Sequence, residues 1–390
     1  MAQRHLDPTD PLAGPAPTGD TLAGYLRTQA TEFLRALRLH RETGSGANGS
    51  EASVEAGRAL RRSARRISAG LHTFQPLLDT DWCEGMRPEL AWVSGTLAME
   101  HAYTARLERL LNALHRLSGS APAAGARADA AAGGRADVPA GARADLAAGS
   151  RAAGAAPVPT RAAPRRAELR NPPPPAQERG NLTVGAAKAG ALLDRQLNLA
   201  RTRAHSTALQ ALGSSRFHAI ADKVAVLASE VPLTRAASTA DLRPLAAAAK
   251  DRLADAVTAL PLVTAGHPYN AAALIHGLSP DTVPHPQDAP WHHVRLLLRL
   301  HRYAREAVSG PKGNAVVDLR LLSAGQALNR HRDASEAAAA AAQAARTPRI
   351  APATAYALGV LHADQRHEVE AARFAFQQAW QKEAEAVSTR

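Results

Sequence analysis

Apolar side chains recur at alternating intervals of three and four residues along several long segments, and this spacing constrains the fold more than any other feature. In residues 54–74 the pattern runs through Leu60, Ala64, Ile67, Leu71 and Phe74, which places all five on one side of an α-helix. Aromatic residues make up only 4% of the chain, and alanine supplies much of its apolar content. This balance favours closely packed helices over a β-sandwich or barrel. We therefore predict an all-α fold.

The helical patterns fall into two groups separated by a low-complexity stretch. Residues 1–20 are rich in Pro, Gly and Asp and predict a flexible tail, whereas residues 21–117 predict a first helical half with a break near Pro88. Residues 118–180 lack large apolar side chains, so we expect a long disordered linker there. Helical patterns return over residues 181–390, which we assign to a second half. The predicted helices span residues 21–44, 54–74, 81–117, 181–212, 214–230, 242–260, 291–309, 314–345 and 353–386.

The GSGANGS stretch at residues 44–50 has the glycine spacing of a dinucleotide-binding loop. It follows a helical pattern rather than a strand, and the dinucleotide site requires a strand before the loop. A flexible connection is the better interpretation.

The chain is strongly basic, with a net charge of +12, and 42 of its 47 basic residues are arginine. The planar guanidinium matches phosphate oxygens two at a time, so a polyanionic partner is plausible. GC-rich codon usage also enriches Arg, Ala, Gly and Pro together. The arginine content alone therefore does not establish a polyanionic partner, and the positions of the arginines must distinguish the two explanations.

Cys83 is the only cysteine, which excludes an internal disulfide and a cysteine-based metal framework. The first residues do not have the pattern of a secretion signal, and no segment is apolar enough to span a membrane. We expect a cytoplasmic protein with no membrane partner, no metal and no cofactor.

Two helical segments carry polar and cationic stripes at the same spacing. In the first, the intervals of 3, 4, 3 and 4 residues place on one face Arg58, Arg61, Arg65, Ser68 and His72. An offset of 234 positions gives the second stripe, which consists of His292, Arg295, Arg299, Arg302 and Glu306. The repetition predicts an internal duplication of the chain.

Acidic residues are absent around both stripes, from residue 57 to 78 and from 291 to 305. Charged helix faces are usually solvated and paired with neighbouring carboxylates. Here the cations have no local partner and repel one another, which favours an anion bound among them.

These segments resemble the CHAD domain, the conserved histidine α-helical domain. In the first basic helix the matching residues are Arg61, Arg65, Arg66, Thr73 and Phe74, and Arg58 stands where the family has its histidine. The second helix matches at His292, Arg295, Arg299, Arg302, Tyr303 and Glu306. A later turn of the family matches at Leu328, Asn329, His331, Asp333 and Ala334.

The resemblance implies two similar antiparallel helical bundles that flank a basic cleft and bind inorganic polyphosphate. Together with the stripes, it gives as polyanion-binding residues Arg58, Arg61, Arg65, His72, His292, Arg295, Arg299, Arg302, Tyr303 and His331. It places Asp333 as a residue that orients a histidine or caps a helix.

Other functions remain open at this stage. The chain lacks the P-loop, the G-x-S-x-G elbow and H-E-x-x-H, so we expect a binding protein rather than an enzyme, with a polyphosphate or phosphoester hydrolase as an alternative. A nucleic-acid-binding or nucleoid-associated helical protein is another alternative, because arginine stripes also suit nucleic-acid backbones. A third is a scaffold that binds a protein through the arginine-rich linker. Polyphosphate binding would place the protein in the cytoplasm, at polyphosphate granules.

Overall fold

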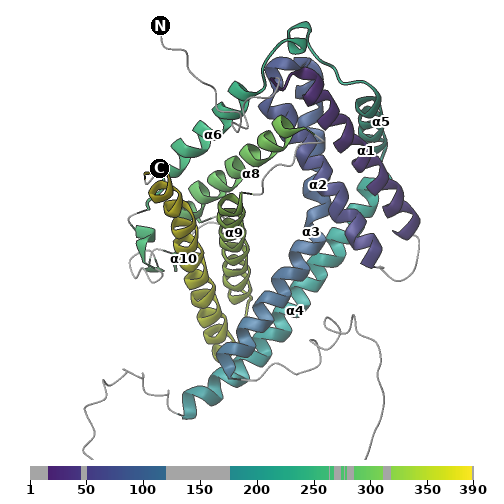
Figure 1. Cartoon of the computed structure of the whole chain (residues 1–390). Helices are drawn as coiled ribbons and strands as arrows, with labels where there is room; N and C mark the ends of the chain where they lie inside the picture. Colours follow the sequence, from purple (N-terminus) through teal and green to yellow (C-terminus); the bar gives the residue numbers. More distant parts are fainter. Residues whose placement is uncertain are drawn as a thin grey trace, which may run out of the picture.

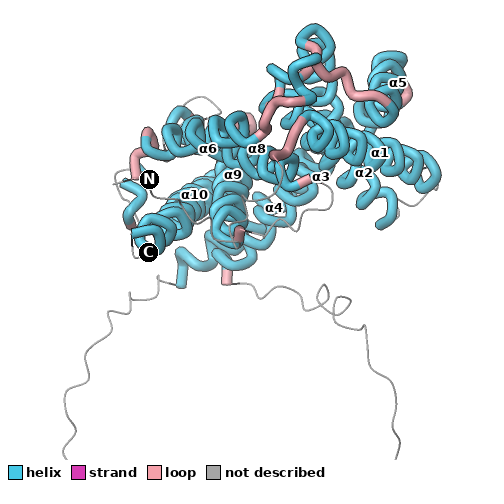
Figure 2. The backbone as a smooth tube through the Cα atoms, turned by 45° about the horizontal axis from the view of Figure 1, so that its top comes forward, coloured by secondary structure: helices cyan, strands magenta, loops and turns pink. Residues whose placement is uncertain are grey.

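The computed structural model describes residues 16–44, 51–119, 176–262, 264–267, 274–275, 277–278, 285–310 and 318–388. Its α-helices are α1 (Gly19–Gly44), α2 (Glu51–Thr73), α3 (Thr80–Ser118), α4 (Ala176–Leu212), α5 (Ser215–Ser229), α6 (Arg243–Thr258), α8 (Ala289–Ser309), α9 (Leu319–Ala345) and α10 (Pro352–Ser388). Short 3₁₀ turns lie at Gln75–Leu77, Arg235–Ser238, Thr264–Gly266 and Pro286–Asp288. In these ranges the backbone consists of helices and connecting loops (Figure 2), with one isolated bridge between Leu78 and Leu233. The all-α prediction is confirmed.

The long helices form a frame, as Figure 1 shows. The antiparallel helices α3 and α4 make one long side, and the α9–α10 hairpin makes another. Helices α6 and α8 cross from the α9–α10 side toward α2, while α1, α2 and α5 pack together at the opposite corner. Helix α8 contacts both α2 and α9, so it connects the two sides of the frame.

Three clusters of buried apolar residues hold these helices together. The first joins α1, α2, α5 and the start of α3, with Phe33, Ile67 and Phe217 among its fully buried or nearly fully buried members. The second joins the C-terminal parts of α3 and α9 to the N-terminal parts of α4 and α10. The third joins α6, α8, the start of α9 and the end of α10 around Trp291 and Phe376. Burial of this apolar surface is the main source of stability for such a fold.

Helices of the predicted first half, residues 21–117, pack against helices of the predicted second half, residues 181–390. Phe217 and Val224 of α5 lie in the same core as Leu22 and Leu26 of α1, and α4 packs along α3. Helices on both sides of residues 118–180 therefore share cores, and α4 also packs against α10. The apolar faces of α1 and α3 are covered in part by α5 and α4, which follow residues 118–180 in the sequence.

Two other predicted boundaries differ. Helix α3 runs without interruption through Pro88, where we expected a break. Pro88 and Glu84, whose carbonyl an amide at position 88 would bond, are both exposed, so water can satisfy the free carbonyl. Helix α4 already begins at Ala176, within the predicted linker. Most of that linker, most of the N-terminal tail and the glycine-rich loop at 44–50 lie outside the described residues.

Close approach of α4 to α10 depends on Gly185. A Cβ atom at this position would lie 2.1 Å from the carbonyl oxygen of Ala353, so only glycine fits without displacing backbone. None of the described helices is long and apolar enough to cross a membrane.

Candidate polyanion-binding site

A cavity of about 480 Å³ lies where α2, α3, α8 and α9 face one another. Six arginines and two carboxylates form its charged lining: Arg61, Arg65, Arg106, Arg109, Arg295, Arg332, Asp333 and Glu336. His101, Asn329 and three alanines of α3 complete it. We call it the arginine cavity. The excess of positive charge in a concave site suits an anionic ligand.

Helix α2 contributes Arg61 and Arg65 because its opposite face is buried. Leu60, Ala64 and Ile67 have no exposed surface, which turns the two arginines toward the cavity. The Arg65 Nε donates a hydrogen bond to the Ser94 Oγ of α3 at 2.9 Å. The side chain is thereby held at the junction of the two helices.

Helix α8 contributes Arg295 in the same manner. Val294 and Leu298 are buried on the other face of this helix, and the Arg295 Nε donates to the Asn329 Oδ1 of α9 at 2.7 Å. Arg299, one turn later, lines an adjoining cavity together with Arg65. The arginines of two segments far apart in the sequence thus meet.

These arginines are close enough to repel one another. Burial, followed by repulsion from Arg299, lowers the pKa of Arg295 to about 9, and Arg65 adds to the lowering from across the cavity. Burial, followed by repulsion from Arg65, lowers the pKa of Arg61 to about 10. The pKa of Arg299 is lowered by burial and then by Arg65. A bound anion would relieve this repulsion.

The two carboxylates neutralise only one end of the cavity. Glu336 accepts a hydrogen bond from Arg106 at 2.6 Å and lies 3.7 Å from Arg332, which also binds Asp333. In the part of the chain that the structure describes, Arg61, Arg65, Arg295 and Arg299 form no ion pair with a carboxylate. These four remain available to an anion.

Comparison with known protein families matches residues 28–342 to the CHAD domain. The chain belongs to the CHAD domain family. Among solved structures it is similar to PptA from Streptomyces chartreusis, with 72% sequence identity, coverage of 94% of this chain and 100% of that chain, and a TM-score of 0.70. No curated protein matches the chain.

The two histidines of the CHAD pattern occupy different environments. The half-buried ring of His292 meets the ring of His331 edge to face, with centroids 5.4 Å apart. His331 itself is 1% exposed, stacks on Trp291 and accepts a hydrogen bond from Arg373 through Nε2 at 3.3 Å. Burial, followed by repulsion from Arg373, lowers the pKa of His331 well below its usual range. The structure places the side chain of His331, a predicted polyanion-binding residue, in the core.

The carboxylate beside His331 is Asp288, not Asp333. The fully buried Asp288 accepts hydrogen bonds from Arg366 at 2.8 Å and from Arg373 at 2.7 Å, and one oxygen lies 3.6 Å from the His331 Nε2. Burial opposes ionisation, but the hydrogen bond and charge of Arg366 hold the pKa of Asp288 well below its usual range. This cluster fastens the start of α8 to α10.

Besides His292 and His331, three predicted residues line neither the arginine cavity nor the adjoining one. Arg58 is exposed, one turn before Arg61, and lies 3.6 Å from Glu55. Arg302 lies beside α9, where a Cβ at Gly325 would meet its guanidinium at 3.7 Å. His72 is half-buried, and burial followed by the charge of Arg87 lowers its pKa. Of the cations in the two stripes, only the central ones line the two cavities, Arg61 and Arg65 of the first and Arg295 and Arg299 of the second.

Tyr303 lies in a second, smaller cavity that adjoins the first at Arg65. This apolar cavity has a volume of about 280 Å³ and is lined by Arg65, Ser68, Ala69, Leu90, Ala91, Ser94, Gly95, Leu296, Arg299, Leu300 and Tyr303. The Tyr303 ring also packs against the guanidinium of Arg66, whose carbon lies 5.3 Å from the ring centroid.

Arg106, Arg109 and Arg332 were not among the predicted site residues. Arg106 and Arg109 are one turn apart on α3, and the Arg109 Nε donates to the Gln365 Oε1 at 2.5 Å. Their spacing on one helix face was a usable signal. For Arg332 the only indication of a place in the site was its position next to His331 in the CHAD turn.

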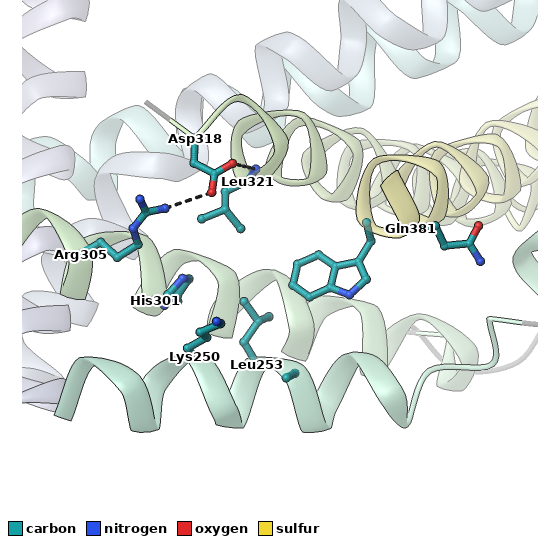
Figure 3. Close-up of a pocket in the computed structure, with 9 residues that line it drawn as sticks. Lys250, Leu253, His301, Arg305, Asp318, Leu321 and Gln381 are labelled. Atoms are coloured by element: carbon teal, nitrogen blue, oxygen red, sulfur yellow. Dashed lines mark hydrogen bonds and ion pairs between the residues drawn. The ribbon is translucent and has the colours of Figure 1, made fainter. Parts of the chain in front are cut away.

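A third cavity of about 480 Å³ lies among α6, α8, α9 and α10 (Figure 3). Lys250, His301 and Arg305 line it, but Arg305 is already paired with Asp318 at 3.2 Å. Its cations are fewer than those of the arginine cavity. Within the described ranges, no group of three or more His, Cys, Asp or Glu side chains is placed to hold a metal ion.

Proposed function

We propose that this chain binds inorganic polyphosphate in the arginine cavity without catalysing a reaction. The observation that carries the proposal is the meeting of six arginines with only two carboxylates in one concave site. Membership of the CHAD family, which is associated with inorganic polyphosphate, supports the choice of ligand. A polymer with one ionised oxygen or more on every unit matches a site with several cations a few ångströms apart.

Binding would use the two basic helices as opposite walls. Arg61 and Arg65 of α2 and Arg295 and Arg299 of α8 donate charge-assisted hydrogen bonds to phosphate oxygens. Each such bond contributes about 1.5–3 kcal/mol. Relief of the repulsion between Arg65 and Arg295 adds to this, because the free site holds their charges close together.

The proposal is tested by titrating the full chain with polyphosphate of defined length at two salt concentrations. Arg295→Ala with Arg299→Ala should weaken binding by at least about 100-fold, since two charge-assisted bonds are lost. Arg201→Ala with Arg203→Ala is the matched control, because it removes the same charge from exposed positions of α4. Equal losses in both double variants would mean that only net charge matters and that the cavity is not the site.

Competition with duplex DNA and RNA separates polyphosphate from the nucleic-acid alternative. Polyphosphate should resist displacement at equal phosphate concentration, whereas displacement by DNA would favour a nucleic-acid-binding protein. Release of orthophosphate from polyphosphate in the presence of magnesium would favour a hydrolase. A cytoplasmic location at polyphosphate granules follows from the proposal and stays a prediction, which imaging of a tagged chain would test.

A further inference from the structure

The apolar cavity beside Arg65 has walls that inorganic phosphate cannot use. Leu90 has no exposed surface and Ala69 is 5% exposed, while Leu296 presents 47% of its side chain at the rim. No carboxylate lines this cavity. Placing phosphate oxygens against these side chains would remove water from the charge without compensating hydrogen bonds, which is unfavourable.

The two cavities adjoin between α2, α3 and α8, and we call them together the groove. Arg65 lines both of them, and Arg295 and Arg299, one helical turn apart, line one each. On α3 the lining continues from Gly95 to Ala98 across the same junction. A molecule with its phosphates among the arginines therefore places its next chemical group in the apolar cavity.

Polar groups at the edge of the apolar cavity restrict what this next group is. The hydroxyls of Ser68, Ser94 and Tyr303 belong to the lining, so hydrogen-bonding atoms lie around apolar walls. Ser94 already accepts a hydrogen bond from Arg65, but a hydrocarbon chain would leave the hydroxyls of Ser68 and Tyr303 without a partner, so a flat ring with apolar faces and polar edges fits this combination better.

We infer that the groove binds a nucleoside polyphosphate, with its phosphates in the arginine cavity and its base in the apolar cavity. The inference rests on the proposed function, because the same arginines hold the phosphates. It adds a second class of ligand, which competes with the inorganic polymer for Arg65 and Arg299.

The test compares two ligands with three phosphates each, ATP and inorganic tripolyphosphate, by calorimetric titration of the full chain at neutral pH in low salt with EDTA. At neutral pH tripolyphosphate carries at least as much negative charge as ATP, so charge alone does not favour ATP. We expect ATP to bind about tenfold more tightly, which corresponds to about 1.4 kcal/mol. Equal or weaker binding of ATP would overturn the inference.

Gly95→Leu places a side chain inside the apolar cavity. A Cβ at Gly95 meets nothing within 4 Å, and leucine is a better helix former than glycine, so the variant should fold. Gly85→Leu is the matched control, since Gly85 is an open position on the same helix that lines neither cavity. The ratio of the two dissociation constants should fall toward one in Gly95→Leu and persist in Gly85→Leu. A ratio that persists in both variants would show that the base lies elsewhere.

The outcomes separate the inference from the proposed function. If polyphosphate and tripolyphosphate bind but ATP binds no more tightly than tripolyphosphate, the inference is wrong and the proposed function stands. If none of the three binds, both are wrong. A comparable gain of farnesyl diphosphate over inorganic diphosphate would assign the cavity to a hydrocarbon chain and exclude the nucleoside.

Discussion

Arg66 of α2 donates hydrogen bonds to Glu306 of α8 at 2.7 and 3.4 Å, across 240 positions of sequence. Tyr303, one turn before Glu306, packs its ring against the same guanidinium. The pair joins the two helices that carry the arginines of the site, next to the apolar cavity. It therefore fixes the distance between the two walls of the groove.

Replacement of this carboxylate should loosen the connection. Glu306→Gln leaves Arg66, whose side chain is only 27% exposed, without its ionic partner. We expect a loss of about 1–3 kcal/mol in the free energy of unfolding, measured by urea denaturation. Glu32→Gln is the control, because its partner Arg35 is 69% exposed, and such a pair contributes below about 1 kcal/mol. Similar losses in the two variants would contradict the role given to Arg66 and Glu306.

Removal of a carboxylate from the arginine cavity should strengthen anion binding. Glu336 occupies Arg106 and repels phosphate, so Glu336→Gln is expected to tighten polyphosphate binding about threefold to tenfold at low salt. The gain should shrink as salt rises. Glu108→Gln, at an exposed position of α3 outside the cavity lining, controls for net charge. A gain of the same size in Glu108→Gln would mean that long-range charge explains the effect.

The affinity for polyphosphate should rise as the pH falls. In the free protein, burial and then repulsion from Arg61 and Arg58 lower the pKa of His101. A bound polyanion offsets this repulsion and raises the pKa, so the complex binds more protons than the free chain, and protons favour the complex. Titrations from about pH 8 to about pH 5.5 span the range in which histidine changes charge.

His101→Gln should flatten this pH profile. Burial and then the charge of Arg295 lower the pKa of His292, and an anion bound at Arg295 offsets the second of these causes, so some slope remains. An unchanged slope in His101→Gln would exclude His101 as the group that takes up the proton.

Stability should fall in mild acid because of His301. This side chain is 8% exposed, and burial, followed by the charges of Arg305 and Lys250, lowers its pKa to about 4. Below about pH 6.5 this histidine is protonated in the unfolded chain but stays neutral in the folded chain. The free energy of unfolding therefore falls between about pH 6.5 and pH 4, by up to about 3 kcal/mol. Urea denaturation at several pH values measures the loss. His301→Leu should reduce the pH dependence; if the slope stays the same, other groups cause it.

The basic helices could be predicted because both of their faces are determined within one segment. The apolar positions of α2 identify the side that is buried, and the opposite side then carries Arg61 and Arg65. The offset of 234 connected these two with Arg295 and Arg299, and all four line the groove.

The remaining contributors depend on tertiary packing, which periodicity does not encode. Arg106 and Arg332 enter the arginine cavity only because α3 and α9 lie against it. His331 lies in the core beside Asp288, which is 43 positions earlier in the sequence. The buried carboxylate of Asp288 also forms ion pairs with Arg366 and Arg373. The packing of α5 against α1 was missed because a long stretch of low complexity separates the two helices in the sequence.

Beside Leu90, His101, Arg106 and Arg109, helix α3 presents a row of small residues to the groove, namely Ala91, Ser94, Gly95, Ala98, Ala102 and Ala105. Because the Arg66–Glu306 pair fixes the distance between α2 and α8, the size of the α3 side chains at these positions decides how much of the space between the walls is open. Single substitutions along this wall can therefore change which ligands are admitted while every phosphate-facing arginine stays in place. In this architecture, selectivity and affinity can evolve separately.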